Sequence, residues 1–112
     1  MKCFYRILFW QNKSGDKPVA KWIKSLHADD QAYLGDLFKD LALDGPRSNP
    51  KIFKHIEGEL WEIRDLRSHS PGYRIYFGFD SGTVVCLVVN AGDKKRQQRD
   101  IELAKKRLKK EV

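Results

Sequence analysis

The sequence contains few of the residues from which covalent and metal-bound sites are built. Only two of its 112 residues are cysteines, Cys3 and Cys86, and both lie in apolar stretches. Because two isolated cysteines give neither a disulfide framework nor a CxxC metal motif, we expect free thiols in a reducing compartment. The three histidines, His27, His55 and His69, lie far apart and do not have the spacing of metal ligands. We therefore expect neither a metal ion nor a cofactor.

Long hydrophobic runs are missing as well. No apolar stretch approaches the roughly 20 residues of a membrane-spanning helix, and Lys2 is not followed by the apolar core of a signal peptide. The sequence also has no glycine-rich phosphate loop and no internal repeat, and its residue spacing does not support a Ser-His-Asp triad. These absences predict a cytoplasmic protein that does not contact a membrane.

Positive charge, in contrast, is abundant. The chain has 22 lysines and arginines against 15 aspartates and glutamates, which gives a net charge of +7. Such a surplus favours an acidic partner, which can be RNA, DNA or an acidic protein segment, and charge alone does not choose among them. Hydrophobic residues make up 41% of the chain, and 112 residues suit one domain, residues 1–112, with its own core.

Hydrophobic periodicity predicts an α+β fold. Helical spacing of apolar residues begins at Val19 and again at Tyr33, with a stop at Gly45 and Pro46, and indicates a helical hairpin. A third amphipathic helix follows near the C-terminus. Strand-like runs occupy residues 3–10, 51–57, 60–64, 73–79 and, after a turn at 80–82, 83–89. We expect a small, twisted, mainly antiparallel sheet with helices on one face and an open, basic opposite face.

Residues 60–79, LWEIRDLRSHSPGYRIYFGF, contain two of these strands and the loop between them. Their alternation assigns Arg64 and Arg74 to one face of the sheet, and to the buried face it assigns Tyr73, Ile75, Phe77 and Phe79. An antiparallel hairpin would bring the two arginines together on the open face of the sheet. Guanidinium groups fixed on a rigid sheet suit a phosphate-bearing ligand. The alternative is that each arginine is an ordinary solvated residue.

Further cations accompany the two arginines. Lys54 lies on a neighbouring strand, and Lys94 and Lys95 follow the last strand. Such a cluster can bind a nucleic-acid backbone, and it can stabilise the extra negative charge of a phosphoryl transition state. RNA supplies its own nucleophile, the 2′-hydroxyl. These residues therefore suit RNA cleavage without a metal much better than DNA cleavage.

Three segments carry a resemblance to a known family. They are GELWEIR, PGYRIYF and a GDK–Q–DI–A run that consists of Gly92, Asp93, Lys94, Gln97, Asp100, Ile101 and Ala104. Together they resemble the killer proteins of HigB-type toxin–antitoxin modules in the RelE/ParE superfamily, and the resemblance covers most of the chain. It implies a RelE-like fold and a ribosome-dependent mRNA endonuclease that uses 2′-hydroxyl attack on the adjacent phosphate. It also implies a small helix-turn-helix, HigA-like antitoxin as partner.

The resemblance also assigns roles to residues. Arg64 matches the arginine of the E-L/I-R strand, Arg74 that of GYR, and Lys94 the lysine of GDK. Lys54 occupies a region in which relatives carry a basic residue, and His55 is a candidate for acid–base catalysis. The residues expected to contact RNA are Lys51, Lys95, Arg96 and Gln97. Some relatives use a C-terminal tyrosine or histidine for proton transfer, and this sequence has no such residue. The resemblance therefore does not identify the general base.

Two other functions remain as alternatives. A ParE-like inhibitor of DNA gyrase would be a binding protein on the same fold, without nuclease chemistry. A nucleic-acid-binding module without toxicity is the third possibility. The predicted clustering of Arg64, Arg74 and Lys94 favours the nuclease, because a gyrase inhibitor has no evident need for these cations on one face.

Overall fold

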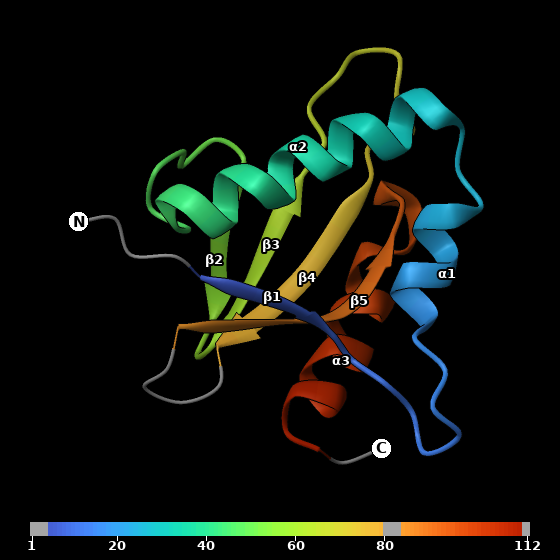
Figure 1. Ribbon diagram of the computed structural model, residues 1–112, viewed down its shortest axis with the longest axis vertical. Coiled ribbons are helices and arrows are strands. Elements are labelled where there is room, and N and C mark those ends of the chain that lie inside the picture. The colour runs from blue at the N-terminus through green and yellow to red at the C-terminus, as the bar shows by residue number, and fades with distance from the viewer. Residues whose placement is uncertain (1–4, 80–83, 111–112) are drawn as a thin grey trace.

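The computed structural model describes residues 5–79 and 84–110, and its elements are labelled in Figure 1. The strands are β1 (Arg6–Phe9), β2 (Phe53–Glu57), β3 (Leu60–Arg64), β4 (Arg74–Phe79) and β5 (Val85–Gly92). The helices are α1 (Pro18–Lys24), α2 (Ala28–Asp44) and α3 (Gln97–Leu108), and a short 3₁₀ turn, η1 (Lys94–Arg96), precedes α3. Cys3 and the predicted turn at residues 80–82 lie outside the described residues.

The five strands form one sheet in the order β1-β5-β4-β3-β2. In the described part of the chain, β1 pairs parallel with β5, and the other neighbouring strands pair antiparallel. The predicted mainly antiparallel sheet of an α+β fold is thus confirmed. The strongly apolar β5 lies inside the sheet, whereas β2 is an edge strand.

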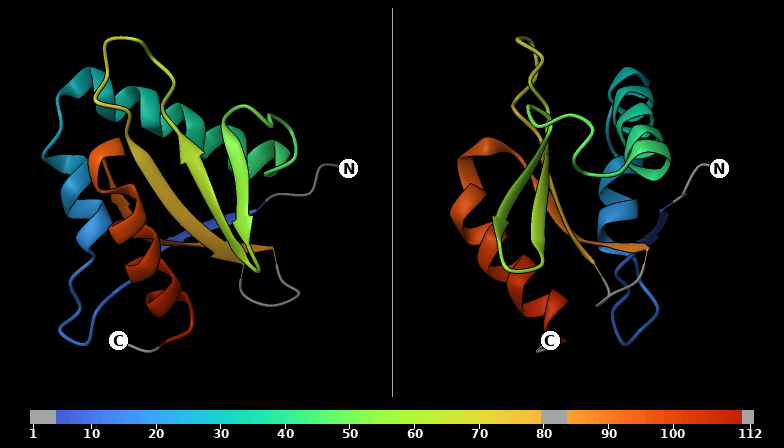
Figure 2. Two further views of the ribbon diagram at one scale, coloured as in Figure 1. Left: turned by 180° about the vertical axis from the view of Figure 1, so that it is seen from behind. Right: turned by 90° about the vertical axis from the view of Figure 1, so that its left-hand side faces the viewer.

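Helices α1 and α2 cover one face of the sheet, as the right-hand view of Figure 2 shows. On α2, Leu34, Leu37 and Leu41 recur at helical spacing and are buried. They belong to the larger core cluster, which also contains Phe77 of β4 and Val88 of β5. The predicted helical hairpin on one face is confirmed. Among residues 5–79 and 84–110, the longest helices are too short or too polar to span a bilayer.

Helix α3 covers the second face of the sheet, so the prediction of an open face is wrong (Figure 2). Leu60, Tyr76 and Val89 are buried on this side together with Ala104 of α3. Because the second face carries large apolar side chains too, leaving it in water would be unfavourable. The helix begins near the end of the sheet at which β3 ends and β4 starts, and Gln97 of α3 contacts Glu62 there.

Trp22 on α1 provides a test of the core. Its ring packs edge-to-face on Tyr73, with 5.2 Å between ring centroids, and it adjoins the larger core cluster. Truncating a fully buried aromatic costs about 3–5 kcal/mol, and the half-buried Trp22 should lose part of that amount. We expect Trp22→Ala to lower the melting temperature measured by circular dichroism, and Lys24→Ala, exposed on the same helix, to leave it nearly unchanged. Equal melting temperatures for both variants would contradict this placement.

Candidate functional site

The β3–β4 hairpin places Arg64 and Arg74 directly opposite each other, as the sequence predicted. Strand alternation puts both on the α3 side of the sheet, with Tyr76. The side chain of Arg64 is 32% exposed, but Arg74 is only 6% exposed. The expectation that Arg74 stands on a solvent-facing side is therefore wrong. The physical reason is that η1 and α3 lie over this face, and Lys94 of η1 packs against Gly72 beside Arg74.

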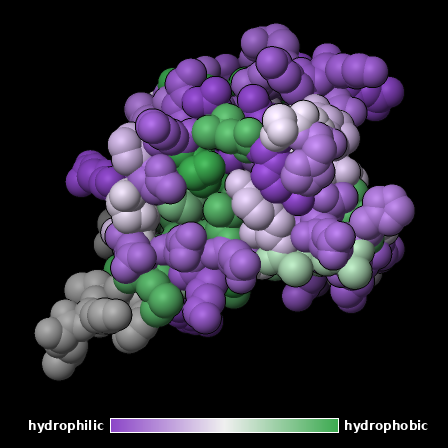
Figure 3. Space-filling model, turned by 90° about the horizontal axis from the view of Figure 1, so that it is seen from above, coloured by the Kyte–Doolittle hydropathy of each residue, from purple (hydrophilic) through white to green (hydrophobic). Residues whose placement is uncertain are grey.

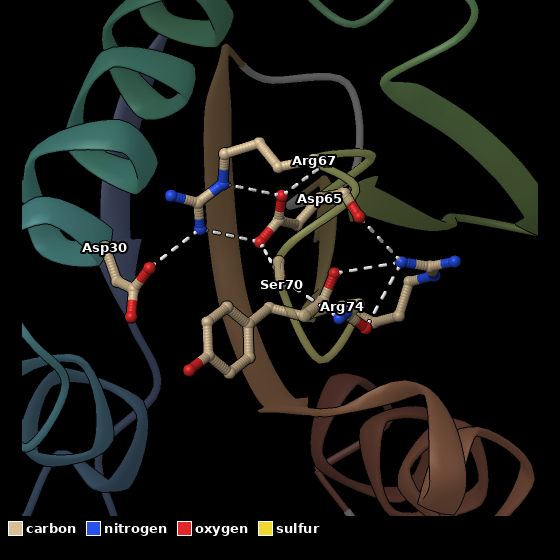
Figure 4. Close-up of polar contacts among 7 residues, drawn as sticks. Asp30, Asp65, Arg67, Ser70 and Arg74 are labelled. Carbon is tan, nitrogen blue, oxygen red and sulfur yellow. Dashed lines mark hydrogen bonds and ion pairs between the residues drawn. The ribbon is translucent and has the colours of Figure 1, made fainter.

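Backbone carbonyl groups hold the Arg74 guanidinium, as Figure 4 shows. Its Nη1 donates to the carbonyl oxygens of Asp65 (3.4 Å), Gly72 (3.2 Å) and Tyr73 (3.1 Å). Its Nε is buried and has no hydrogen-bond partner among the residues that the structure describes. A buried donor without a protein partner is uncommon in native structures, and a catalytic role is one of its recognised explanations. Arg74 is thus oriented by Nη1, and its Nε is a buried donor without a partner among the described residues.

A network around Arg67 fixes the loop that provides these carbonyl groups. Arg67 donates to the carboxylate of Asp65 from Nε (2.9 Å) and Nη2 (2.8 Å), and from Nη2 to Oδ1 of Asp30 on α2 (3.0 Å). The Ser70 hydroxyl donates to Asp65 and accepts a hydrogen bond from the Gly72 N–H. Figure 4 shows that this network lies on one side of the loop and Arg74 on the other. The loop is therefore tied to α2.

The charges of this network stabilise each other. Burial acts to raise the pKa of Asp65, but the hydrogen bonds from Arg67 and Ser70 outweigh it and hold that pKa below its usual value. The hydrogen bonds with Asp65 in turn raise the pKa of Arg67. The Arg67 guanidinium also lies 4.0 Å from the centre of the Tyr33 ring on α2, a favourable cation–π distance. These interactions preorganise the carbonyl groups that bind Arg74.

A buried carboxylate, Glu62, lies on the same face as the arginines and was not identified from the sequence. Glu62 is 2% exposed, its Oε2 accepts a hydrogen bond from Gln97 Nε2 (3.3 Å), and its Oε1 lies 3.8 Å from Arg64 Nε. The sequence pattern predicts an outward-facing strand residue here, because it does not show that α3 lies over this face and contacts Glu62 through Gln97. The signal that could have identified Glu62 is the strand parity that it shares with Arg64.

Lys54, Lys94 and Gln97 join this site, as expected. Lys54 is exposed on β2 and stands opposite Glu62 in the sheet, which places it on the same face. Lys94 begins η1, and Gln97 begins α3. The remaining cations that were predicted to contact RNA are exposed on the adjoining segments: Lys51, Lys95 and Arg96.

His55 does not lie with the arginines. It alternates with Lys54 on β2 and so faces the α2 side of the sheet. Its ring packs on Trp61, with 5.2 Å between ring centroids, and its Nε2 lies 2.8 Å from the carbonyl oxygen of Gly58. The expectation that His55 acts beside the arginines is corrected accordingly, because an alternating strand sends neighbouring side chains to opposite faces.

The site can bind a phosphodiester and stabilise added negative charge, because four cations lie near one end of the sheet. These cations are Lys54, Arg64, Arg74 and Lys94.

Seen from above in Figure 3, the molecule presents a mostly hydrophilic surface around a smaller hydrophobic patch. Residues 5–79 and 84–110 contain no group of three or more histidine, cysteine, aspartate or glutamate side chains that could hold a metal ion.

Comparisons with known proteins give one family and one fold. The family described as Phage derived protein Gp49-like (DUF891) matches residues 21–109. No curated protein matches the sequence. A solved structure of E. coli toxin RelE in the free state, with two arginines mutated to alanine, has a TM-score of 0.66 and 22% sequence identity, and the match covers 93% of this chain and 97% of that chain. The similarity confirms the predicted RelE-like fold.

Proposed function

Because this chain belongs to the Gp49-like family of phage-derived proteins and has a RelE-like fold, we propose that it is the toxin of a type II toxin–antitoxin module. We propose further that it is a HigB-type, ribosome-dependent mRNA endonuclease that stops translation. The observation that carries this proposal is the pairing of Arg64 with Arg74 at the end of the hairpin, beside Lys54 and Lys94.

The proposed reaction is attack of an mRNA 2′-hydroxyl on the adjacent phosphorus. The partly exposed Arg64 binds the phosphate, and the unpartnered Nε of Arg74 donates to one of its oxygens. Lys54 and Lys94 offset the negative charge that develops in the transition state. The exposed residues around this centre bind the flanking RNA strand: Lys51, Lys95 and Arg96, with Gln97 at the start of α3.

The experiment that tests this function uses ribosomes programmed with a defined message. The protein should cut the message in the A site, and a single 2′-deoxynucleotide at the cut position should prevent cleavage, because the nucleophile is then missing. A 2′-deoxynucleotide several positions away is the control and should leave cleavage unchanged. Intact mRNA, together with DNA damage and stalled replication after induction in cells, would contradict the nuclease and support the ParE-like gyrase inhibitor.

We also propose a small helix-turn-helix, HigA-like antitoxin as the partner. The net charge of +7 favours a partner with an acidic surface or segment. The product of the neighbouring open reading frame should co-elute with this protein in size-exclusion chromatography. Separate elution of the two proteins at micromolar concentration would contradict the partnership.

A further inference from the structure

Glu62 stands among the cations of the site. In the sheet it lies opposite Lys54 of β2 and opposite Tyr76 of β4, and it shares the α3 face with Arg64, two residues further along β3. Its side chain is 3% exposed. A buried negative charge here opposes the binding of a phosphate, so Glu62 weakens the site unless it has another function.

The Glu62 carboxylate makes few polar contacts for a buried group. Among the described residues, Oε2 accepts one hydrogen bond from Gln97, and Arg64 Nε lies 3.8 Å from Oε1, beyond hydrogen-bond range. An ionised carboxylate has about four acceptor positions. Asp65 differs, because it accepts hydrogen bonds from both the backbone and the guanidinium of Arg67 and from Ser70. The Asp65 carboxylate thus accepts four hydrogen bonds, whereas that of Glu62 accepts one from the described residues.

The other ionisable groups around Glu62 fit the role of a base less well. Lysine and arginine side chains are cations and serve to bind the phosphate. Burial, and then the charge of Glu62, raise the pKa of Tyr76, so this phenol stays protonated. Asp100 of α3 lies beside Gly92 of β5, on the far side of β4 from β3, which carries Glu62 and Arg64. Among the described residues, the ionisable groups placed near the site include Lys54, Arg64, Arg74, Tyr76, Lys94 and Asp100, with Asp93, Arg96 and Arg99 acting on Asp100.

We propose that Glu62 is the general base of the cleavage reaction, an assignment that rests on the proposed function. The Glu62 carboxylate takes the proton of the 2′-hydroxyl while the 2′-oxygen forms a bond with the adjacent phosphorus. The bond between phosphorus and the 5′-oxygen breaks, and the 5′-oxygen receives a proton from water. The products are a 2′,3′-cyclic phosphate and a 5′-hydroxyl. The 2′-hydroxyl replaces the Gln97 amide at Oε2.

The test is the rate of single-turnover cleavage on programmed ribosomes, measured over a range of pH. Glu62→Gln should slow cleavage by about 10²–10⁴, the usual contribution of a general base. The wild-type rate should rise with pH and then level off, because only an ionised carboxylate can act as a base. Glu62→Gln should lack this rise. Glu62→Asp keeps a carboxylate on a side chain one methylene shorter, so its rate should be lower but should still rise with pH. If Glu62→Gln does not fold, Glu62→Asp tests whether Glu62 is the base.

Two carboxylates of the same chain serve as matched controls. Glu59→Gln changes an exposed residue at the β2–β3 turn and should leave both the rate and its pH dependence unchanged. Asp100→Asn removes the other carboxylate whose charge acts on Tyr76 and should retain the rise with pH. If Asp100→Asn loses the rise and Glu62→Gln keeps it, the base is Asp100 and the assignment is wrong.

Binding separates this assignment from the proposed function itself. Glu62→Gln removes a negative charge, so it should sediment with ribosomes at least as well as the wild-type protein. If the wild-type protein cuts no message, both the proposed function and this assignment fail. If the wild-type protein cuts and a folded Glu62→Gln variant cuts at the same rate with the same pH dependence, the assignment of Glu62 fails and the nuclease stands.

Discussion

Replacing Arg74 by alanine is expected to slow mRNA cleavage by about 10²–10³, the usual effect of removing one donor that stabilises a developing charge. Three carbonyl groups fix Nη1 of this arginine, and Nε is the buried donor that has no partner among the described residues. Arg74→Lys should restore little of the rate, because one ammonium group cannot reproduce the planar fork. Primer extension on programmed ribosomes measures both rates.

Loss of stability must be separated from loss of chemistry in this experiment, because Arg74 is buried and its removal leaves carbonyl groups without their donor. Circular dichroism on the same preparations gives the temperature range in which each variant is folded, and the rates are compared within it. Arg99→Ala, which changes an exposed arginine on α3, is the matched control and should cut normally. A folded Arg74→Ala protein that cuts at the wild-type rate would place the active site elsewhere.

The second large effect is expected on stability, at Asp65. Removing one partner of a buried ion pair costs about 3–5 kcal/mol, and Asp65→Ala should fall near the lower end because Arg67 keeps its contact with Asp30. Urea denaturation gives the free energy of unfolding. Asp36→Ala, an exposed aspartate on α2, is the control and should change it little. Equal losses for both variants would show that the network adds nothing to stability.

The same network predicts a dependence of stability on pH. The pKa of Asp65 is lower in the folded than in the unfolded chain, so its contribution is present above the unfolded pKa of about 3.9 and is lost as the pH falls through the folded value. The wild-type protein should therefore lose stability below about pH 4. Asp65→Asn should show a shallower acid loss in the same denaturation series. Parallel curves for the two proteins would exclude Asp65 as a source of the acid sensitivity.

The β3–β4 hairpin, which contains Arg64 and Arg74, could be predicted because it depends on residues that are close together in the sequence. Ile63 and Ile75 alternate with Arg64 and Arg74, and the short polar loop allows an antiparallel pairing. The pairing of Arg64 with Arg74 then follows from the sequence alone.

The position of α3 could not be predicted in the same way. The stripe of Ile101, Ala104 and Leu108 indicates an apolar helix face but does not say which side of the sheet it covers, because β5 is apolar on both sides. The burial of Glu62 and of Arg74 depends on which side α3 covers. The sequence therefore did not predict that either side chain is buried. The contact between Arg67 and Asp30 was missed for a related reason: it joins segments far apart in the chain.

The parallel pairing of β1 with β5 has a consequence for the order of folding. Arg6 pairs with Val85, so the first strand has no sheet partner until about eighty further residues have been synthesised. Closing so long a loop costs conformational entropy before the contact stabilises anything, which delays this step relative to the local β3–β4 hairpin. Helix α3 comes later still in the chain and completes the surroundings of Glu62 and Arg74. A chain that is still being translated therefore holds its arginine pair in an unfinished site, and the assembled site appears only after α3 has been synthesised.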